Sequence, residues 1–84
     1  MTTPAQALAT AEAYVHAERS YARVAGLLED DRDYLVELEL VPPFAEWPLG
    51  PGFVLISKAT GRVRSLPPSP ELLYRIDAMT PVRG

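Results

Sequence analysis

The chain contains one histidine, His16, and no cysteine. Glu12 precedes His16 by four residues, a spacing that places both side chains on the same side of a helix. Two ligands do not make a zinc site, because such sites use at least three protein ligands. We therefore interpret His16 as an ordinary helix histidine in contact with water, and we predict neither a metal site nor a cofactor.

Four acidic residues are grouped near the middle of the chain, at Glu29, Asp30, Asp31 and Asp33. Carboxylates at this density could hold calcium, but the D-x-D-x-D-G spacing and the distal glutamate of a calcium loop are missing. The simpler interpretation is a solvated turn whose carboxylates have ordinary pKa values. In a protein-binding surface, Asp30, Asp31 and Asp33 would form part of an acidic rim.

Two further carboxylates lie in the segment Tyr34–Val41, which alternates between apolar and mixed positions. Leu35, Glu37 and Glu39 fall on one face, whereas the other face is wholly apolar: Tyr34, Val36, Leu38 and Leu40. This pattern is typical of a strand with one buried and one water-facing side. Glu37 and Glu39 could attract a basic partner by electrostatic steering, and an ordinary water-facing sheet surface is the alternative.

Two large aromatic residues, Phe44 and Trp47, lie in a loop rich in proline and glycine. Exposed tryptophan is enriched at the energetic centres of protein interfaces. A loop tryptophan can equally close a small hydrophobic core. Both interpretations of Trp47 remain open at this point.

No pattern of residues predicts catalysis. The chain has no G-x-S-x-G motif, and its serine and threonine residues have no histidine placed by sequence to activate them. The net charge of −3 and the pI near 5.0 argue against nucleic-acid binding. We therefore expect a protein partner and no enzymatic activity.

The sequence also predicts a location. No apolar run approaches the roughly 20 residues that span a bilayer. The first fifteen residues lack a basic start and include Glu12, so they do not resemble a secretory signal. The absence of cysteine suits a reducing compartment. We expect a cytoplasmic protein that forms a single domain over residues 1–84 and has no membrane contact.

The first element expected is a helix from Thr3 to about Arg19. Thr3 is a good N-cap, Pro4 suits the first helical position, and Gln6 can complete a capping box. The predicted apolar stripe consists of Leu8, Ala11 and Val15, flanked by Ala7 and Tyr14. The many alanines would let this helix approach a sheet closely.

The segment Tyr21–Leu28 is ambiguous, because it could extend the helix or form a strand. The acidic turn that follows, and the strand after it, favour a strand. At a period of two, one face would be Ala22, Val24, Gly26 and Leu28, and the other Tyr21, Arg23, Ala25 and Leu27.

Two further strands are predicted as a hairpin. The apolar run Phe53–Ser57 is followed by a turn at residues 59–61 and by the segment Arg62–Leu66. A short helix follows, with Ser69 as its cap, and we expect Pro81 to end it before a tail at residues 82–84. The expected apolar face of this helix is Leu72, Leu73, Ile76 and Met79. The expected fold class is α+β, with the N-terminal helix packed on a three- to four-stranded antiparallel meander sheet and a short C-terminal helix.

The alanine-rich helix Ala5–Glu18, the central sheet and the late segment Val54–Val63, an apolar strand that runs into a turn and a further strand, resemble the YrhB-like proteins, also grouped as the immunity protein 35 family. Trp47 departs from the family pattern, which places a G-W-[VIF]-[FV]-[FY] strand before the final hairpin. The resemblance implies a small cytoplasmic bacterial protein that binds and neutralises a partner toxin. A weaker resemblance to PepSY-like domains rests on the same elements and implies protease inhibition.

We therefore expect an immunity-type inhibitor that occludes a partner toxin and is a monomer or weak homodimer. The expected contacts are Phe44 and Trp47 as apolar anchors, with Glu37, Glu39 and the Asp30–Asp33 turn as an acidic rim. The alternative is a non-catalytic structural or chaperone-like accessory domain that forms an oligomer through an exposed sheet edge.

Overall fold

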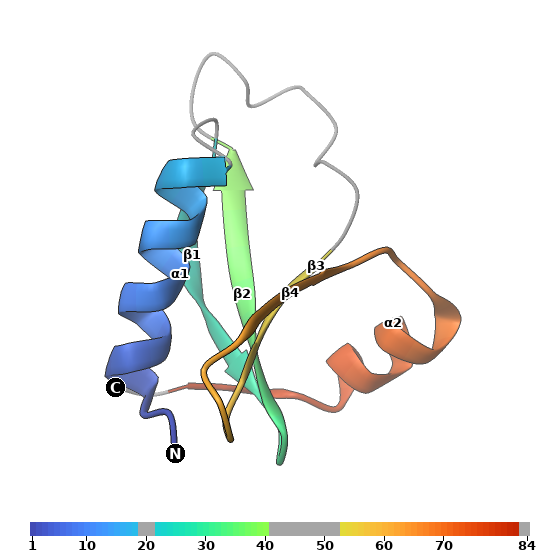
Figure 1. The fold of residues 1–84 in the computed structure, drawn as a ribbon. Helices are drawn as coiled ribbons and strands as arrows, with labels where there is room; N and C mark the ends of the chain where they lie inside the picture. Colours follow the sequence, from blue (N-terminus) through green and yellow to red (C-terminus); the bar gives the residue numbers. More distant parts are fainter. Residues whose placement is uncertain (19–21, 41–52, 83–84) are drawn as a thin grey trace.

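The computed structural model describes residues 1–18, 22–40 and 53–82, and within them five antiparallel strands form one sheet with a helix on each face (Figure 1). The elements in chain order are α1 (Pro4–Glu18), β1 (Ala22–Glu29), β2 (Asp33–Leu40), β3 (Phe53–Ser57), β4 (Val63–Leu66), α2 (Pro70–Asp77) and β5 (Thr80–Pro81). The strands lie in the order β4-β3-β2-β1-β5. The α+β fold class is confirmed. No helix in the described ranges is long and apolar enough to cross a membrane.

Helix α1 begins with the capping box that the sequence predicts. The backbone N–H of Gln6 donates to Thr3 Oγ1 over 3.2 Å, and the backbone N–H of Thr3 donates to Gln6 Oε1 over 2.9 Å. These two bonds satisfy backbone donors that the first turn of a helix otherwise leaves open.

The buried side of α1 is Ala7, Ala11 and Val15, so the predicted stripe is wrong at Leu8, which is 40% exposed. Helical spacing alone allowed either residue 7 or residue 8 to face the sheet. Ala7 and Ala11 are completely buried, and their small side chains let the helix backbone approach the sheet. The close approach of helix and sheet therefore favours burial of the side with Ala7 and Ala11 over burial of Leu8.

Two hydrophobic cores lie on opposite faces of the sheet. The core beneath α1 contains Ala7, Ala11, Leu27, Tyr34, Val36, Val54 and Ile56. The core beneath α2 contains Leu35, Leu55, Leu72 and Met79. Alternate residues of β2 thus enter different cores, as the period of a strand requires. Helix α2 covers Leu35 but leaves Glu37 exposed, so the predicted water-facing side of β2 is only partly open.

Strand β1 confirms the strand interpretation for the part of Tyr21–Leu28 that is described; Tyr21 lies outside the described residues. The predicted strict alternation is wrong, because the register shifts between Val24 and Gly26. Val24 pairs with Leu38 and Gly26 pairs with Glu37, so Ala25 is an extra residue, as in a β-bulge. The bulge brings both Val24 and Leu27 to the core beneath α1.

The C-terminal segment forms strand β5, where the sequence predicted only a helix end and a tail. Pro81 pairs with Leu28, and the backbone N–H of Val82 donates to the Leu27 carbonyl over 2.9 Å. Proline lacks an N–H, and a position on an edge strand tolerates that loss. Val82 packs against the core beneath α1, so the chain passes from one face of the sheet to the other around the β1 edge.

The β3–β4 hairpin forms as predicted. The backbone N–H of Ser57 donates to the Arg62 carbonyl over 2.9 Å, and Gly61 adopts a φ of +75° at the end of the turn. Glycine adopts that backbone conformation without the steric cost that other residues incur.

Candidate functional site

The turn between β1 and β2 is shaped by the side chain of Asp30. Its Oδ1 accepts hydrogen bonds from the backbone N–H groups of Arg32 and Asp33, both over 2.9 Å. The backbone N–H of Asp30 in turn donates to the Asp33 carbonyl over 3.1 Å. Aspartate is common in turns because its carboxylate can bond the backbone in this way.

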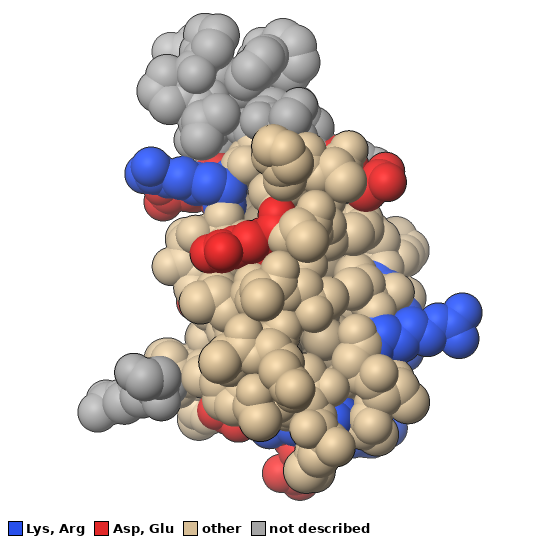
Figure 2. All heavy atoms as spheres, turned by 60° about the vertical axis from the view of Figure 1, so that its left-hand side comes forward, with Lys and Arg blue, Asp and Glu red and all other residues tan. Residues whose placement is uncertain are grey.

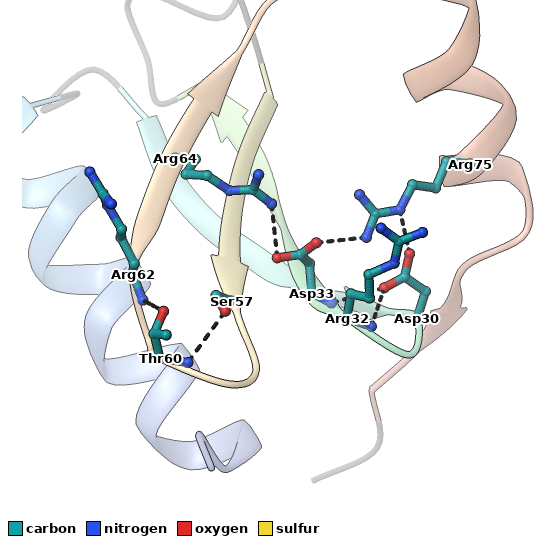
Figure 3. A network of polar contacts seen from close by, with 8 residues as sticks. All are labelled: Asp30, Arg32, Asp33, Ser57, Thr60, Arg62, Arg64 and Arg75. Atoms are coloured by element: carbon teal, nitrogen blue, oxygen red, sulfur yellow. Dashed lines mark hydrogen bonds and ion pairs between the residues drawn. The ribbon is translucent and has the colours of Figure 1, made fainter.

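Asp33 is the first residue of strand β2. Among the described residues it is the one charged residue that is buried, with 4% of its surface exposed. Arg64 of β4 donates from Nη2 to Asp33 Oδ1 over 3.0 Å (Figure 3). Arg75 of α2 donates from Nη2 to Asp33 Oδ2 over 2.6 Å. The carboxylate of Asp33 thus connects the start of β2 with the edge strand β4 and with helix α2.

Arg75 also binds the turn itself, because its Nε donates to Asp30 Oδ2 over 2.5 Å. Burial alone would raise the pKa of Asp30, but hydrogen bonds from Arg75 and from the backbone N–H groups of Asp33 and Arg32 outweigh it and lower that pKa from 3.8 to about 2. Hydrogen bonds to Asp30 and Asp33 raise the pKa of Arg75 above its ordinary value. We call Asp30, Asp33, Arg64 and Arg75 the ion-pair network.

The prediction of a solvated turn with ordinary pKa values is therefore wrong for two of its residues. Asp33 is buried, and Asp30 has a lowered pKa because arginine and backbone donors surround it. Asp31 is exposed and has no ion pair among the described residues. The sequence missed the arginines because they come from β4 and α2, 31 to 45 residues away along the chain.

A separate ion pair, outside this network, lies at the other side of the turn. Lys58 Nζ approaches Glu29 Oε1 to 2.7 Å, and it lies 5.0 Å from the centroid of the Tyr34 ring. The hydrogen bond to Glu29 raises the pKa of Lys58. Glu29, like Asp30 and Asp33 but unlike Asp31, is thus paired with a cation.

Glu37 and Glu39 lie on the face of the sheet that carries α2, beyond the end that the helix covers. Glu39 pairs with the exposed Arg23 opposite it on β1. Glu37 is exposed and lies over Gly26, where an added Cβ would come within 3.1 Å of its Oε1. Glu37 therefore contributes an acidic group at the surface, whereas the charge of Glu39 is partly compensated.

The two predicted aromatic anchors, Phe44 and Trp47, lie outside the described residues. His16 is exposed on α1, as the sequence predicts. In the described part of the chain, no three His, Asp or Glu side chains come together in a way that could hold a metal ion.

Helix α2 presents two apolar side chains to solvent that the sequence did not identify as site residues. Leu73 is 49% exposed and Tyr74 is 82% exposed. The sequence placed Leu73 on the buried side, but Leu72 and Ile76 hold that side instead. The exposed Glu71 and Asp77 lie at the two ends of the same helix.

The opposite side of the molecule, where α1 lies, has a different surface. Figure 2 shows a broad area there without Lys, Arg, Asp or Glu, and charged side chains mainly around it. The exposed residues of α1 include Leu8 and several alanines.

Comparison of the chain with protein-family models, with curated protein sequences and with solved structures finds no match.

Proposed function

We propose that the chain is a small cytoplasmic protein-binding domain of the immunity type, which occludes a partner toxin and needs no cofactor. The observation that carries the proposal is the exposed pair Leu73 and Tyr74 on α2. Tyrosine is among the residues enriched at the energetic centres of protein interfaces, because it combines a large apolar ring with a hydroxyl group.

The position of α2 supports the proposal, because a rigid anchor loses little conformational entropy on binding. Ser69 caps the helix by accepting a hydrogen bond at Oγ from the backbone N–H of Leu72 over 3.1 Å. Leu72 is buried in the core, and Arg75 is bound to two carboxylates. Tyr74 therefore projects from a helix that is held on both its apolar and its charged sides.

Charge supports the same surface. Glu71 and Asp77 flank the exposed pair, and Glu37 is exposed on the same face of the sheet. Apolar anchors with an acidic rim are complementary to a basic partner. Phe44 and Trp47 remain proposed anchors as well, and Glu37 keeps its predicted role in the rim.

The proposal is tested with the protein encoded by the neighbouring gene as the candidate partner, by pull-down and then by calorimetry. We expect Tyr74→Ala to weaken binding by about tenfold or more. Leu8→Ala is the matched control, because it also shortens an exposed apolar side chain but on α1. Both variants should unfold at the wild-type temperature. Equal, specific binding by wild type, Tyr74→Ala and Trp47→Ala would remove this assignment.

The alternative is an accessory domain that works as an oligomer, and strand β4 favours it. This strand lies at the end of the sheet order, and no described strand pairs with its outer edge. An open edge is a template for pairing with a second chain. Light scattering over a range of concentrations separates the two functions, because a monomer at every concentration contradicts the oligomer.

A further inference from the structure

Helix α2 carries three exposed side chains at a spacing of three residues, Glu71, Tyr74 and Asp77. Residues three apart are neighbours on the surface of a helix, so the two carboxylates flank the Tyr74 ring. Helical side chains lean toward the N-terminus, which inclines Asp77 toward Tyr74. We call these three residues the α2 stripe. It faces away from the core, because Leu72 is the buried residue of the helix.

The α2 stripe carries two negative charges, and no cation of the described chain compensates them. Neither Glu71 nor Asp77 forms an ion pair with another described residue. Arg75 is the one cation in the sequence of α2. Its side chain runs toward the β1–β2 turn, where it binds Asp30 and Asp33 (Figure 3). The charge of the stripe therefore remains for a partner.

Folding explains Glu71 but does not explain Asp77. Glu71 lies in the first turn of α2, where the positive end of the helix dipole favours a carboxylate. Asp77 is the last residue of the helix, where the same dipole disfavours a negative charge. Aspartate is also a weak helix former. Residues that oppose local folding preferences are expected where a function requires them.

Tyr74 is not explained by folding either, because 82% of its surface is exposed. The face of a tyrosine ring attracts a cation that lies over it. With a carboxylate on each side, the ring offers one group both an apolar contact and opposite charge. Arginine matches both features, since its flat guanidinium group stacks on aromatic rings and donates paired hydrogen bonds to carboxylates.

We propose that the α2 stripe binds an arginine side chain of the partner protein, with the guanidinium group over the Tyr74 ring and hydrogen-bonded to Asp77. This inference rests on the proposed function, because it names the chemical group that the partner places at α2. Glu71 adds charge attraction from the other side of the ring. A lysine would bind less well, because its compact and strongly hydrated ammonium group forms no paired hydrogen bonds.

The test uses the peptide acetyl-Gly-Arg-Gly-Arg-Gly-amide as a probe and follows backbone amide and tyrosine ring signals by NMR. In one control peptide citrulline replaces both arginines, which keeps the shape of the side chain but removes its charge. In another, lysine replaces them. We expect saturable shifts at residues 71–78 with the arginine peptide, weaker binding of the lysine peptide, and no binding of the citrulline peptide.

Two variants test the contacts. Tyr74→Leu keeps an apolar side chain but removes the ring, and Asp77→Asn removes the charge. Each should raise the dissociation constant of the arginine peptide about two- to fivefold. Glu12→Gln is the matched control, because it removes an exposed carboxylate from α1, and it should bind the peptide as wild type does. Equal affinity in all four proteins, or equally tight binding of the lysine or citrulline peptide, would overturn the proposal.

Thermal unfolding without peptide separates binding from folding. Asp77→Asn should unfold at the wild-type temperature or slightly above it, because the helix dipole no longer opposes a charge there. A lower unfolding temperature would show that Asp77 serves the fold, and would overturn its assigned role.

The protein encoded by the neighbouring gene separates this inference from the proposed function. If Tyr74→Ala weakens its binding but Tyr74→Leu and Asp77→Asn do not, α2 is an apolar anchor. The arginine is then overturned, while the proposed function stands. If the arginine peptide binds as expected but no variant, Tyr74→Ala included, alters binding of the neighbouring protein, the arginine site stands and the proposed function fails.

Discussion

Replacing Asp33 by asparagine removes the charge at the centre of the ion-pair network while keeping the size of the side chain. The backbone N–H of Asp33, which bonds Asp30 and closes the turn, is untouched. Arg64 and Arg75 now bind separate carboxylate oxygens. In the variant one arginine would meet an amide NH₂ group, so a donor would face a donor in a buried position.

The expected cost follows from burial. Removal of one partner of a fully buried ion pair costs roughly 3–5 kcal/mol of the free energy of unfolding. The side chain of Asp33 is 5% exposed, but those of Arg64 and Arg75 are 45% and 29% exposed and can regain water. We therefore expect Asp33→Asn to cost about 2–3 kcal/mol. A chain of 84 residues has a total stability of roughly 4–13 kcal/mol, so this loss is a large fraction of it.

The measurement is urea unfolding at neutral pH, followed by far-UV circular dichroism. The free energies of unfolding are compared with the same dependence on urea concentration for all variants. Glu39→Gln is the control, because it removes one carboxylate charge from the exposed pair with Arg23. That variant should lose less than about 1 kcal/mol. If Asp33→Asn is no more destabilised than Glu39→Gln, burial does not give the network its strength and the reasoning fails.

Two further predictions concern the turns. Asp30 has a folded pKa of about 2 against an ordinary 3.8, so its contribution to stability is complete above about pH 5 and is lost as the pH falls through 3.8 toward 2. As the pH is lowered, the urea concentration at the unfolding midpoint should therefore fall less steeply in Asp30→Asn than in wild type. Equal slopes would contradict the pKa assignment. Gly61→Ala should lower the free energy of unfolding by about 1–2 kcal/mol, since φ is +75° and the new Cβ would lie 3.1 Å from Thr2 Oγ1. Thermal unfolding measures this effect, and an unchanged midpoint would show that the turn adapts without strain.

The parts of the fold that the sequence predicts correctly depend on nearby residues. The Thr3–Gln6 capping box joins residues three positions apart, and so does the cap by Ser69. The hairpin depends on a glycine at the one turn position with a positive φ. In each case the interacting groups are so close in sequence that no other part of the chain decides the outcome.

The parts that could not be predicted depend on distant partners. The bulge at Ala25 is defined by pairing with β2, and β5 forms because the chain leaves α2 beside the open edge of β1. The sequence pattern predicts Leu8 and Leu73 on the buried sides of their helices, and both are exposed, because helical spacing fixes a stripe only to within about one residue position. The arginine partners of Asp33 cannot be predicted either, because they are distant in sequence. In the sequence alone, an aspartate that will be buried and paired looks the same as one that faces water.

The ion-pair network also affects how binding experiments must be interpreted. Arg75 is part of the same short helix that carries Tyr74, and it is bound through Asp30 and Asp33 to the β1–β2 turn. A substitution at Asp33 therefore weakens the attachment of α2, and the proposed anchor would lose its fixed position without being altered. Reduced partner binding by Asp33→Asn would not show that Asp33 contacts the partner. Tyr74→Ala leaves the network intact, so it separates a contact at α2 from the attachment of α2.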